Sequence, residues 1–322
     1  MSRRKFIALS VVCFLAVSCI SHAQQWNLAY GNSRNQVAFY NSTTPGFTED
    51  SPYGPMAFRV VKDQLWVLDS VGGRILGLDS NNELKTEIKI PGIPQNVLLE
   101  DFALVAGSAG NPETVWVADA ADCSIRKLSL ANGRELVKIG GNGNESGRFL
   151  QISQLEVGRG GRLYVCDIGR QIVAVFTPYG ELVREMPCQR SGFAVDMAGN
   201  LHLLDYNDKY GYMHRVYSHS GQLMKAVHIG MRTFQNPKIW GVNEQGGLLV
   251  SFVPENGFEG KLKLFEFAAD ASVLRRSELP PGRSMNRFVA ISDQKLWLAE
   301  ADFAAAPAGE FKIRSLDWDV KK

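Results

Sequence analysis

The chain has 322 residues, of which 45% are hydrophobic and 21% are charged. This composition is typical of a soluble globular protein with a large core, and it excludes a low-complexity or collagen-like chain. The 35 basic and 33 acidic residues nearly cancel, so the charge balance offers none of the basic excess that nucleic-acid binding requires.

Residues 1–23 are predicted to be an export signal. The segment has a basic start, an apolar stretch over residues 6–20 and a small-residue cleavage site that ends at Ala23. Its "SRRKFI" resembles a twin-arginine motif, and an ordinary basic signal start explains the same residues. The protein is therefore expected to be periplasmic or secreted, by either route. Removing the segment changes the formal net charge from +2 to −1, because it contains three basic residues and no acidic one.

A lipid anchor at Cys19 is a less favoured alternative, because Leu15 lies one position too far from that cysteine for a lipoprotein signal. The apolar stretch is too short for a comfortable membrane span, and no later segment resembles one. Three cysteines remain after residue 23, and their odd number allows at most one disulfide. Which pair would form it stays open: the three are Cys123, Cys166 and Cys188.

One short strand pattern recurs six times along residues 24–322. Five copies are apolar-aromatic runs that end in an acid, and the fifth in chain order is a weaker copy without one; they begin 38 to 50 residues apart. This spacing is typical of propeller blades. The copies are "LWVLD" at 65–69, "VWVAD" at 115–119, "LYVCD" at 163–167, "LHLLD" at 201–205, "LLVSF" at 248–252 and "LWLAE" at 296–300.

Each copy is flanked by further short strands and by turns rich in glycine and asparagine, such as "ANGREL" and "PYGEL". Six units of four antiparallel strands predict an all-β, six-bladed propeller formed by residues 24–322 as one domain. The last unit lacks an outer strand. We expect residues 25–30 to pair with that unit and close the ring, which removes an unpaired edge.

The third unit, "GGNGNESGRFLQISQLEVGRGGRLYVCDIGRQIVAVFTPYGEL", resembles an NHL repeat over almost its whole length. Looser copies extend the resemblance over nearly all of residues 24–322, although Phe252 and Glu300 replace the usual aspartate. YWTD-type propellers are the nearest alternative family. The resemblance implies a fold far more than a function. Related six-bladed propellers include lyases and lactonases with metal or acid–base residues in the central channel.

The glycine-rich run "IGGNGNESGRF" at 139–149 superficially resembles a phosphate-binding loop. A phosphate loop joins a strand to a helix, but here the following segment reads as another strand. We therefore predict a connection between the second and third blades. The aspartates that end the repeated runs are interpreted as structural, because a carboxylate entering a turn accepts backbone N–H bonds.

Motifs for catalysis are absent from the sequence: it has no GxSxG, HExxH, GK[ST] or CxxC. No cofactor is predicted. A divalent metal in the channel stays open, and its candidate ligands are the inner-strand residues Glu156, Asp196 and Asn243. Glu156 and Asp196 do not share a register, which weakens that interpretation.

Binding is expected at the mouth where the loops between strands two and three, and between blades, gather. Residues 31–55, 205–214 and 301–311 form long aromatic-rich connections there. The candidate ligand-binding residues are Tyr53, Tyr206, Tyr210, Tyr212 and His214. Such rings suit a protein, peptide or glycan partner; capping of the blades explains them equally. The sequence thus favours an exported non-catalytic binding protein, with a lyase or lactonase carrying a channel metal as the alternative.

Overall fold

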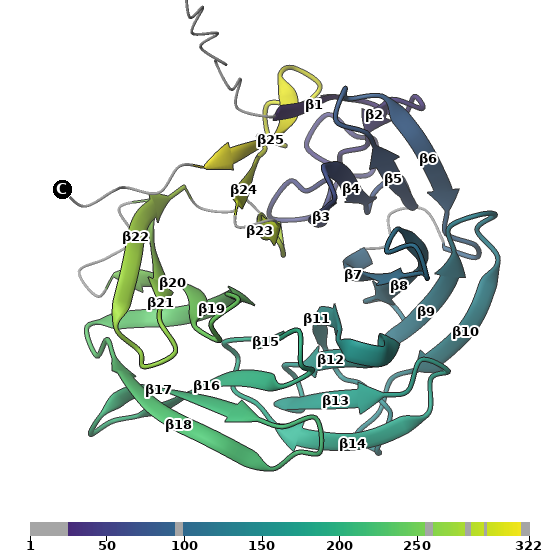
Figure 1. Cartoon of the computed structure of the whole chain (residues 1–322). Helices are drawn as coiled ribbons and strands as arrows, with labels where there is room; N and C mark the ends of the chain where they lie inside the picture. The colour runs from purple at the N-terminus through teal and green to yellow at the C-terminus, as the bar shows by residue number, and fades with distance from the viewer. Residues whose placement is uncertain (1–24, 94–98, 255–259, 281–284, 293–294, 317–322) are drawn as a thin grey trace, which may run out of the picture.

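The computed structural model describes residues 25–93, 99–254, 260–280, 285–292 and 295–316. Six sheets built on four antiparallel strands each stand around a central axis in this part of the chain (Figure 1). The predicted six-bladed, all-β propeller is confirmed. The only helical element among the described residues is a single 3-10 turn, Arg159–Gly161.

Blades 1 to 3 each consist of four consecutive strands, and the first strand of each lies nearest the axis. Blade 1 is β3 (Ala57–Val61), β4 (Gln64–Asp69), β5 (Arg74–Leu78) and β6 (Leu84–Lys89). Blade 2 is β7 (Leu99–Ala106), β8 (Pro112–Asp119), β9 (Ser124–Ser129) and β10 (Glu135–Gly140). Blade 3 is β11 (Ile152–Val157), β12 (Leu163–Asp167), β13 (Ile172–Phe176) and β14 (Leu182–Pro187).

Blades 4 and 5 repeat this arrangement. Blade 4 is β15 (Phe193–Val195), β16 (Leu201–Asn207), β17 (Gly211–Tyr217) and β18 (Leu223–Gly230). Blade 5 is β19 (Phe234–Val242), β20 (Leu248–Pro254), β21 (Leu262–Phe267) and β22 (Val273–Leu279).

Blade 6 joins both ends of the described chain. Its inner strands are β23 (Val289–Ser292), β24 (Lys295–Glu300) and β25 (Glu310–Leu316), and β1 (Gln25–Tyr30) pairs antiparallel with β25. The short β2 (Gln36–Val37) adds to β1 in parallel. The expected closure by residues 25–30 is confirmed, and Figure 1 shows β1 beside β25.

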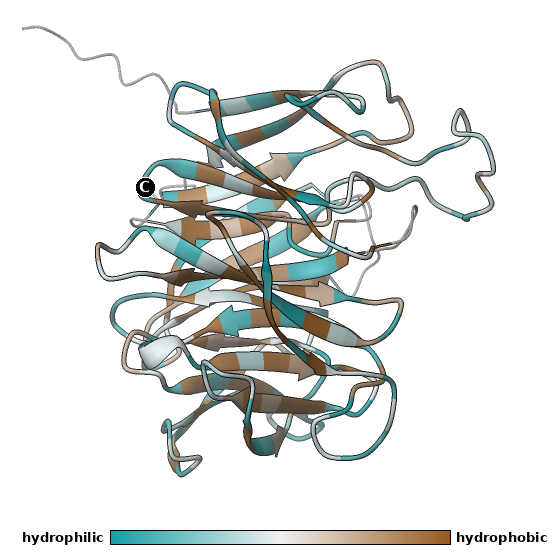
Figure 2. Ribbon diagram, turned by 90° about the vertical axis from the view of Figure 1, so that its right-hand side faces the viewer, coloured by the Kyte–Doolittle hydropathy of each residue, from teal (hydrophilic) through white to brown (hydrophobic). Residues whose placement is uncertain are grey.

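The hydrophobic core lies in layers between neighbouring blades. The large rings at one register of the second strands are buried in these layers, as the repeat predicts: Trp66 between blades 1 and 2, Trp116 between blades 2 and 3, Tyr164 between blades 3 and 4, and Trp297 between blades 6 and 1. Figure 2 shows hydrophobic residues concentrated in the strands and hydrophilic ones in the connections. Burial on both faces stabilises each blade only when its neighbours are present.

The glycine-rich run is a connection between β10 and β11, as predicted. Gly140 has a φ of +88°, and a Cβ there would lie 2.7 Å from the ring of Phe149, so only glycine fits. Asp167 fixes the far end of this connection, because its carboxylate accepts the N–H groups of Leu150 and Gln151 at 3.0 and 2.9 Å. The repeated aspartate therefore has the structural role that we expected at this blade.

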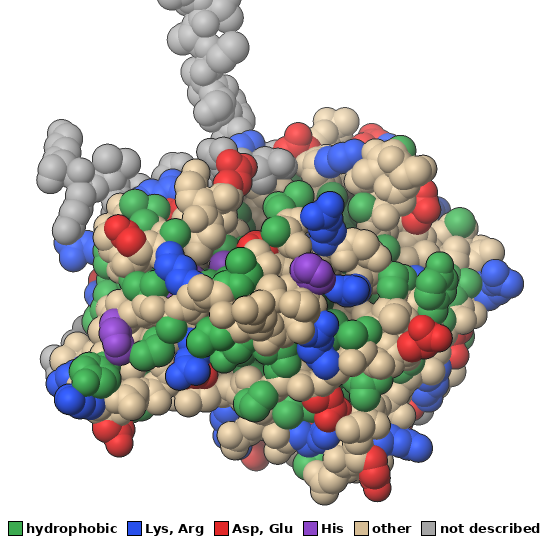
Figure 3. All heavy atoms as spheres, turned by 60° about the horizontal axis from the view of Figure 1, so that its bottom comes forward, with side chains coloured by type: hydrophobic (Ala, Val, Ile, Leu, Met, Phe, Trp, Pro, Cys, Tyr) green, Lys and Arg blue, Asp and Glu red, His purple; other side chains and the backbone are tan. Residues whose placement is uncertain are grey.

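The surface carries both signs of charge, interspersed on the face that Figure 3 shows. In the described part of the chain, no helix is long and apolar enough to cross a membrane. The predicted export signal and Cys19 lie outside the described residues.

Candidate functional site

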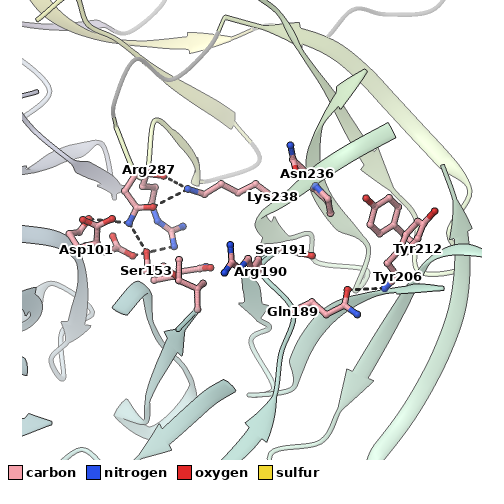
Figure 4. Close-up of a pocket in the computed structure, with 16 residues that line it drawn as sticks. Asp101, Ser153, Gln189, Arg190, Ser191, Tyr206, Tyr212, Asn236, Lys238 and Arg287 are labelled. Carbon is pink, nitrogen blue, oxygen red and sulfur yellow. Dashed lines mark hydrogen bonds and ion pairs between the residues drawn. The ribbon is translucent and has the colours of Figure 1, made fainter. Parts of the chain in front are cut away.

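A cavity of about 480 Å³ opens at one mouth of the central channel. Residues from blades 2 to 5 and from three connections line it, so it exists only in the closed ring. It lies on the side where the loops between strands two and three gather. Its polar lining includes Glu100, Ser153, Gln189, Arg190, Tyr206 and Lys238 (Figure 4).

An ion cluster forms the floor of the cavity at the axis. Asp101 is fully buried, and its carboxylate lies 3.0 Å from Nη2 of Arg59 and 3.6 Å from Nη2 of Arg287. Its Oδ2 also accepts the N–H of Leu155 at 2.9 Å. Arg287 in turn contacts Glu156 at 2.7 Å. Both carboxylates of the cluster are therefore already paired with arginines.

Lys238, on β19, reaches from the wall toward this cluster (Figure 4). Its ammonium donates to the backbone oxygen of Asn286 and, at 3.0 Å, to Oδ1 of the same residue. The ammonium also lies 4.9 Å from the centre of the Trp240 ring. Burial lowers the pKa of Lys238 to about 8, with a smaller contribution from the charge of Arg287.

Glu100 lies in the same cavity, beside Asp101 in the sequence. Burial raises the pKa of Glu100 to about 7; the negative charge of Asp101 adds to this, and the positive charge of Lys238 opposes it. The cavity thus holds a carboxyl group and an amine whose pKa values both lie near neutral pH. Such pairs are typical of acid–base sites.

Two of the predicted mouth residues line the cavity. Tyr206 and Tyr212 face each other across the β16–β17 hairpin, with ring centres 4.9 Å apart at 61°. Tyr206 is 42% exposed, whereas Tyr212 is buried and its hydroxyl donates to the backbone oxygen of Phe234 at 3.3 Å. The segment expected to be a loop is mostly strand. Tyr210, in the turn, packs instead against His228, with ring centres 4.9 Å apart.

The remaining aromatic candidates lie elsewhere. His214 is buried inside blade 4, where its Nε2 lies 2.9 Å from Nδ1 of His202. Tyr53 packs against Tyr40, with ring centres 5.3 Å apart, in the connection between β2 and β3. Neither residue lines the cavity.

The three channel candidates for a metal do not meet. Glu156 lies at the axis, but it is paired with Arg287. Asp196 and Asn243 occupy matching turns, where each accepts backbone N–H groups, and Asp196 also contacts His202 at 3.3 Å. No group of three or more His, Cys, Asp or Glu residues among those described could hold a metal ion. Glu156, Asp196 and Asn243 therefore do not form a joint divalent-metal site in the described part of the chain.

The described cysteines are free thiols. Cys166 and Cys188 pack in one layer between blades 3 and 4, and the Cys188 thiol donates to the backbone oxygen of Gln189 at 3.0 Å. Cys123 lies in the layer between blades 2 and 3.

Sequence reasoning missed Glu100, Arg190 and Lys238. A usable signal existed for two of them, because charged residues inside the apolar inner strands of a propeller point toward its axis. "LEDFALVA" of β7 and "NPKIWG" of β19 both contain such charges. Arg190 lies in the connection from β14 to β15, where the repeat pattern gives no register.

No family profile and no curated protein matches the sequence. Several solved structures share the fold at low identity. A member of the DUF4221 family from Bacteroides vulgatus has a TM-score of 0.56 at 11% identity, with 92% of this chain and 98% of that chain covered. Hydrazine synthase from Kuenenia stuttgartiensis has 0.54 at 16%, covering 80% and 76%. Virginiamycin B lyase from Staphylococcus aureus has 0.51 at 13%, covering 87% and 99%.

These findings correct the expectation of a non-catalytic binding protein. Among the similar solved structures, most of those that carry a functional name are enzymes. The enzymatic alternative is therefore the better supported of the two expectations. At these identities the likeness itself shows the propeller fold alone. The sequence did not indicate this alternative more strongly because Glu100 and Lys238 meet in one cavity only where the inner strands of separate blades converge.

Proposed function

We propose that the protein is an acid–base enzyme of the lyase class that breaks a carbon–oxygen bond in the channel-mouth cavity. One observation carries the proposal: Glu100 and Lys238 share a cavity at the axis, where burial brings both pKa values close to neutral. A scaffold needs neither group there, because each costs desolvation energy.

The two groups are suited to complementary roles. Near pH 7.5, Glu100 is largely a carboxylate and Lys238 largely an ammonium ion, given pKa values of about 7 and about 8. The carboxylate removes a proton from the carbon next to a substrate's acid group. The bond from the neighbouring carbon to its oxygen substituent breaks, a carbon–carbon double bond forms, and Lys238 protonates the departing oxygen. Solvent then returns the two groups to their starting states.

Elimination is favoured over lactone hydrolysis by the charge in the cavity. Arg190 lines the cavity, and its guanidinium donates no hydrogen bond to, and forms no ion pair with, any described residue. When the carbon next to a carboxylate loses a proton, negative charge accumulates on the carboxylate oxygens in the transition state. A cation beside those oxygens stabilises this charge. A lactone offers no free carboxylate for this cation to bind.

The proposal also includes the NHL character of the repeat and export from the cytoplasm. The repeat is supported by the third blade, whose sequence carries the resemblance most fully. Export is supported by the form of residues 1–23.

The test uses β-alkoxy carboxylates, in which the alkoxy group is bonded to the β-carbon and the proton is removed from the α-carbon between it and the carboxylate. Turnover produces ultraviolet absorbance from a conjugated double bond. Glu100→Gln and Lys238→Met should each lower the rate by about 10²- to 10⁴-fold, while the exposed changes Glu181→Gln and Lys85→Met leave it unchanged. Elimination at the wild-type rate by both cavity variants, or products without a double bond, would contradict the lyase assignment.

A further inference from the structure

Arg190 is the cation in the cavity that has no partner. Of the cavity's other cations, Arg287 is paired with Asp101 and Glu156, and the ammonium of Lys238 hydrogen bonds with Asn286. Among the described residues, no hydrogen bond or ion pair involves the Arg190 side chain. Its planar fork of donors matches the two oxygens of a carboxylate.

The backbone next to Arg190 is hydrogen bonded to two neighbouring blades. The backbone oxygen of Ser191 accepts the N–H of Ile239 at 2.9 Å. The side chain of Gln154 makes two hydrogen bonds to the backbone of Phe193, at 2.7 and 3.1 Å. The backbone that follows Arg190 is therefore tied to blades 3 and 5, and the exposed guanidinium extends from this anchored segment.

The same segment is tied to an exposed aromatic ring. Oε1 of Gln189, the residue before Arg190, accepts the N–H of Tyr206 at 2.9 Å. The Tyr206 ring is braced by Tyr212, whose own hydroxyl is bonded to the backbone. Figure 4 shows the two tyrosines on one side of the cavity and Arg190 between Ser191 and Ser153. A half-exposed ring fixed in a cavity wall favours stacking with a flat or ring-shaped ligand.

We infer that the cavity binds a ring-bearing carboxylate, with the acid group on Arg190 and the ring against Tyr206. This inference deepens the proposed function, on which it rests for the identity of the reacting site. Two sources share the chemistry: an acidic sugar, whose ring carries its own carboxylate, and an aromatic acid.

Binding of two probes to the whole protein tests the inference without turnover. The probes are sodium glucuronate and sodium 3-phenylpropanoate, and their uncharged partners are methyl glucoside and 3-phenylpropanol, each titrated by calorimetry. We expect the wild type to bind at least one of the acids, and to bind it more tightly than its uncharged partner. Binding of glucuronate alone identifies an acidic sugar, and binding of phenylpropanoate alone identifies an aromatic acid.

The variants assign the contacts. Arg190→Met should weaken binding about tenfold or more, since a charge-assisted pair is lost, and Arg190→Lys should restore part of it. Tyr206→Ala should weaken binding about fivefold. The matched controls, Arg159→Met and Tyr179→Ala, lie in a separate groove between blades 3 and 4 and should bind as the wild type does.

The inference is overturned if the wild type binds neither acid at millimolar concentration, if the uncharged partners bind equally well, or if Arg190→Met or Tyr206→Ala has no effect. Glu100→Gln separates it from the proposed function, because this change removes a negative charge and should bind the acids at least as tightly. A protein that binds through Arg190 and eliminates nothing would retain this inference and lose the lyase assignment.

Discussion

Nη2 of Arg287 lies 2.7 Å from Oε1 of Glu156, although the two residues belong to blades on opposite sides of the axis. Arg287 precedes β23 of blade 6, and its backbone N–H donates to the oxygen of Met56 beside blade 1 at 2.9 Å. Glu156 belongs to β11 of blade 3. The contact spans the channel and couples three blades, so the floor of the cavity also contributes to ring closure.

The buried carboxylate of Asp101 should be essential to this floor. Asp101→Asn leaves Arg59 and Arg287 without the charge that both contact, and breaking a buried pair typically costs about 3–5 kcal/mol. Urea unfolding measures the loss. Asp50→Asn, on an exposed loop, should change the free energy of unfolding by less than about 0.5 kcal/mol. Equal stability of the two variants would show that the axial ions contribute little.

Ring closure should depend on Trp26 of β1. Its side chain is fully buried, its Nε1 donates to the backbone oxygen of Asp79 at 2.7 Å, and its ring centre lies 5.0 Å from that of Trp297. Trp26→Ala should cost about 3–5 kcal/mol. Trp26→Phe should cost less because it keeps most of the buried surface, and Gln25→Ala should cost almost nothing. A wild-type melting temperature for Trp26→Ala would mean that β1 is dispensable.

The fold was predictable because each blade repeats the same local signals. The run "LWVLD" and its copies indicated the position of every second strand, and the missing outer strand of the last unit indicated that residues 25–30 close the ring. Tyr206 and Tyr212 were predictable for the same reason, since the repeat places their hairpin at the mouth. The length of that hairpin could not be predicted from the repeat, because the pairing of Tyr206 with Tyr212 depends on packing within blade 4.

The chemistry of the cavity was not predictable in this way. Glu100 and Lys238 are far apart in the sequence, and their proximity depends on the closure of the ring rather than on the period of the repeat. For the metal candidates, the repeat predicted a shared register correctly, but that register did not produce a shared site. Asp196 and Asn243 share a register, as the sequence indicates, but that register lies in a turn where the side chain bonds the backbone.

The buried histidines of blade 4 should make the protein sensitive to acid. Burial lowers the pKa of His214 to about 3, and it also lowers the pKa of His202. Between the ordinary value of about 6.5 and the folded value, the unfolded chain binds the proton and the folded chain does not. Stability is therefore complete above about pH 6.5 and falls as the pH decreases, by up to about 1.4 kcal/mol per pH unit for each histidine.

Urea unfolding at several pH values from 7 to 4 measures this slope. His214→Leu removes one titrating group and should flatten the slope, whatever its effect on the stability at pH 7. His219→Gln, at an exposed turn, should leave the slope as it is in the wild type. An unchanged slope for His214→Leu would place the acid sensitivity elsewhere.

Burial should make the amine of Lys238 titrate far below an ordinary lysine, and the charge of Glu100 should partly oppose this lowering of the pKa. Labelling with acetic anhydride across pH 6 to 11, followed by mass spectrometry of the peptide, should give a midpoint of about 8 for Lys238. The same peptide in the urea-unfolded protein should titrate near 10.4. The carboxylate of Glu100 raises the pKa of Lys238, so Glu100→Gln should move the midpoint below that of the wild type. A midpoint that rises in Glu100→Gln, or one that already equals the unfolded value in the wild type, would contradict the electrostatic pairing on which the proposed acid–base chemistry depends.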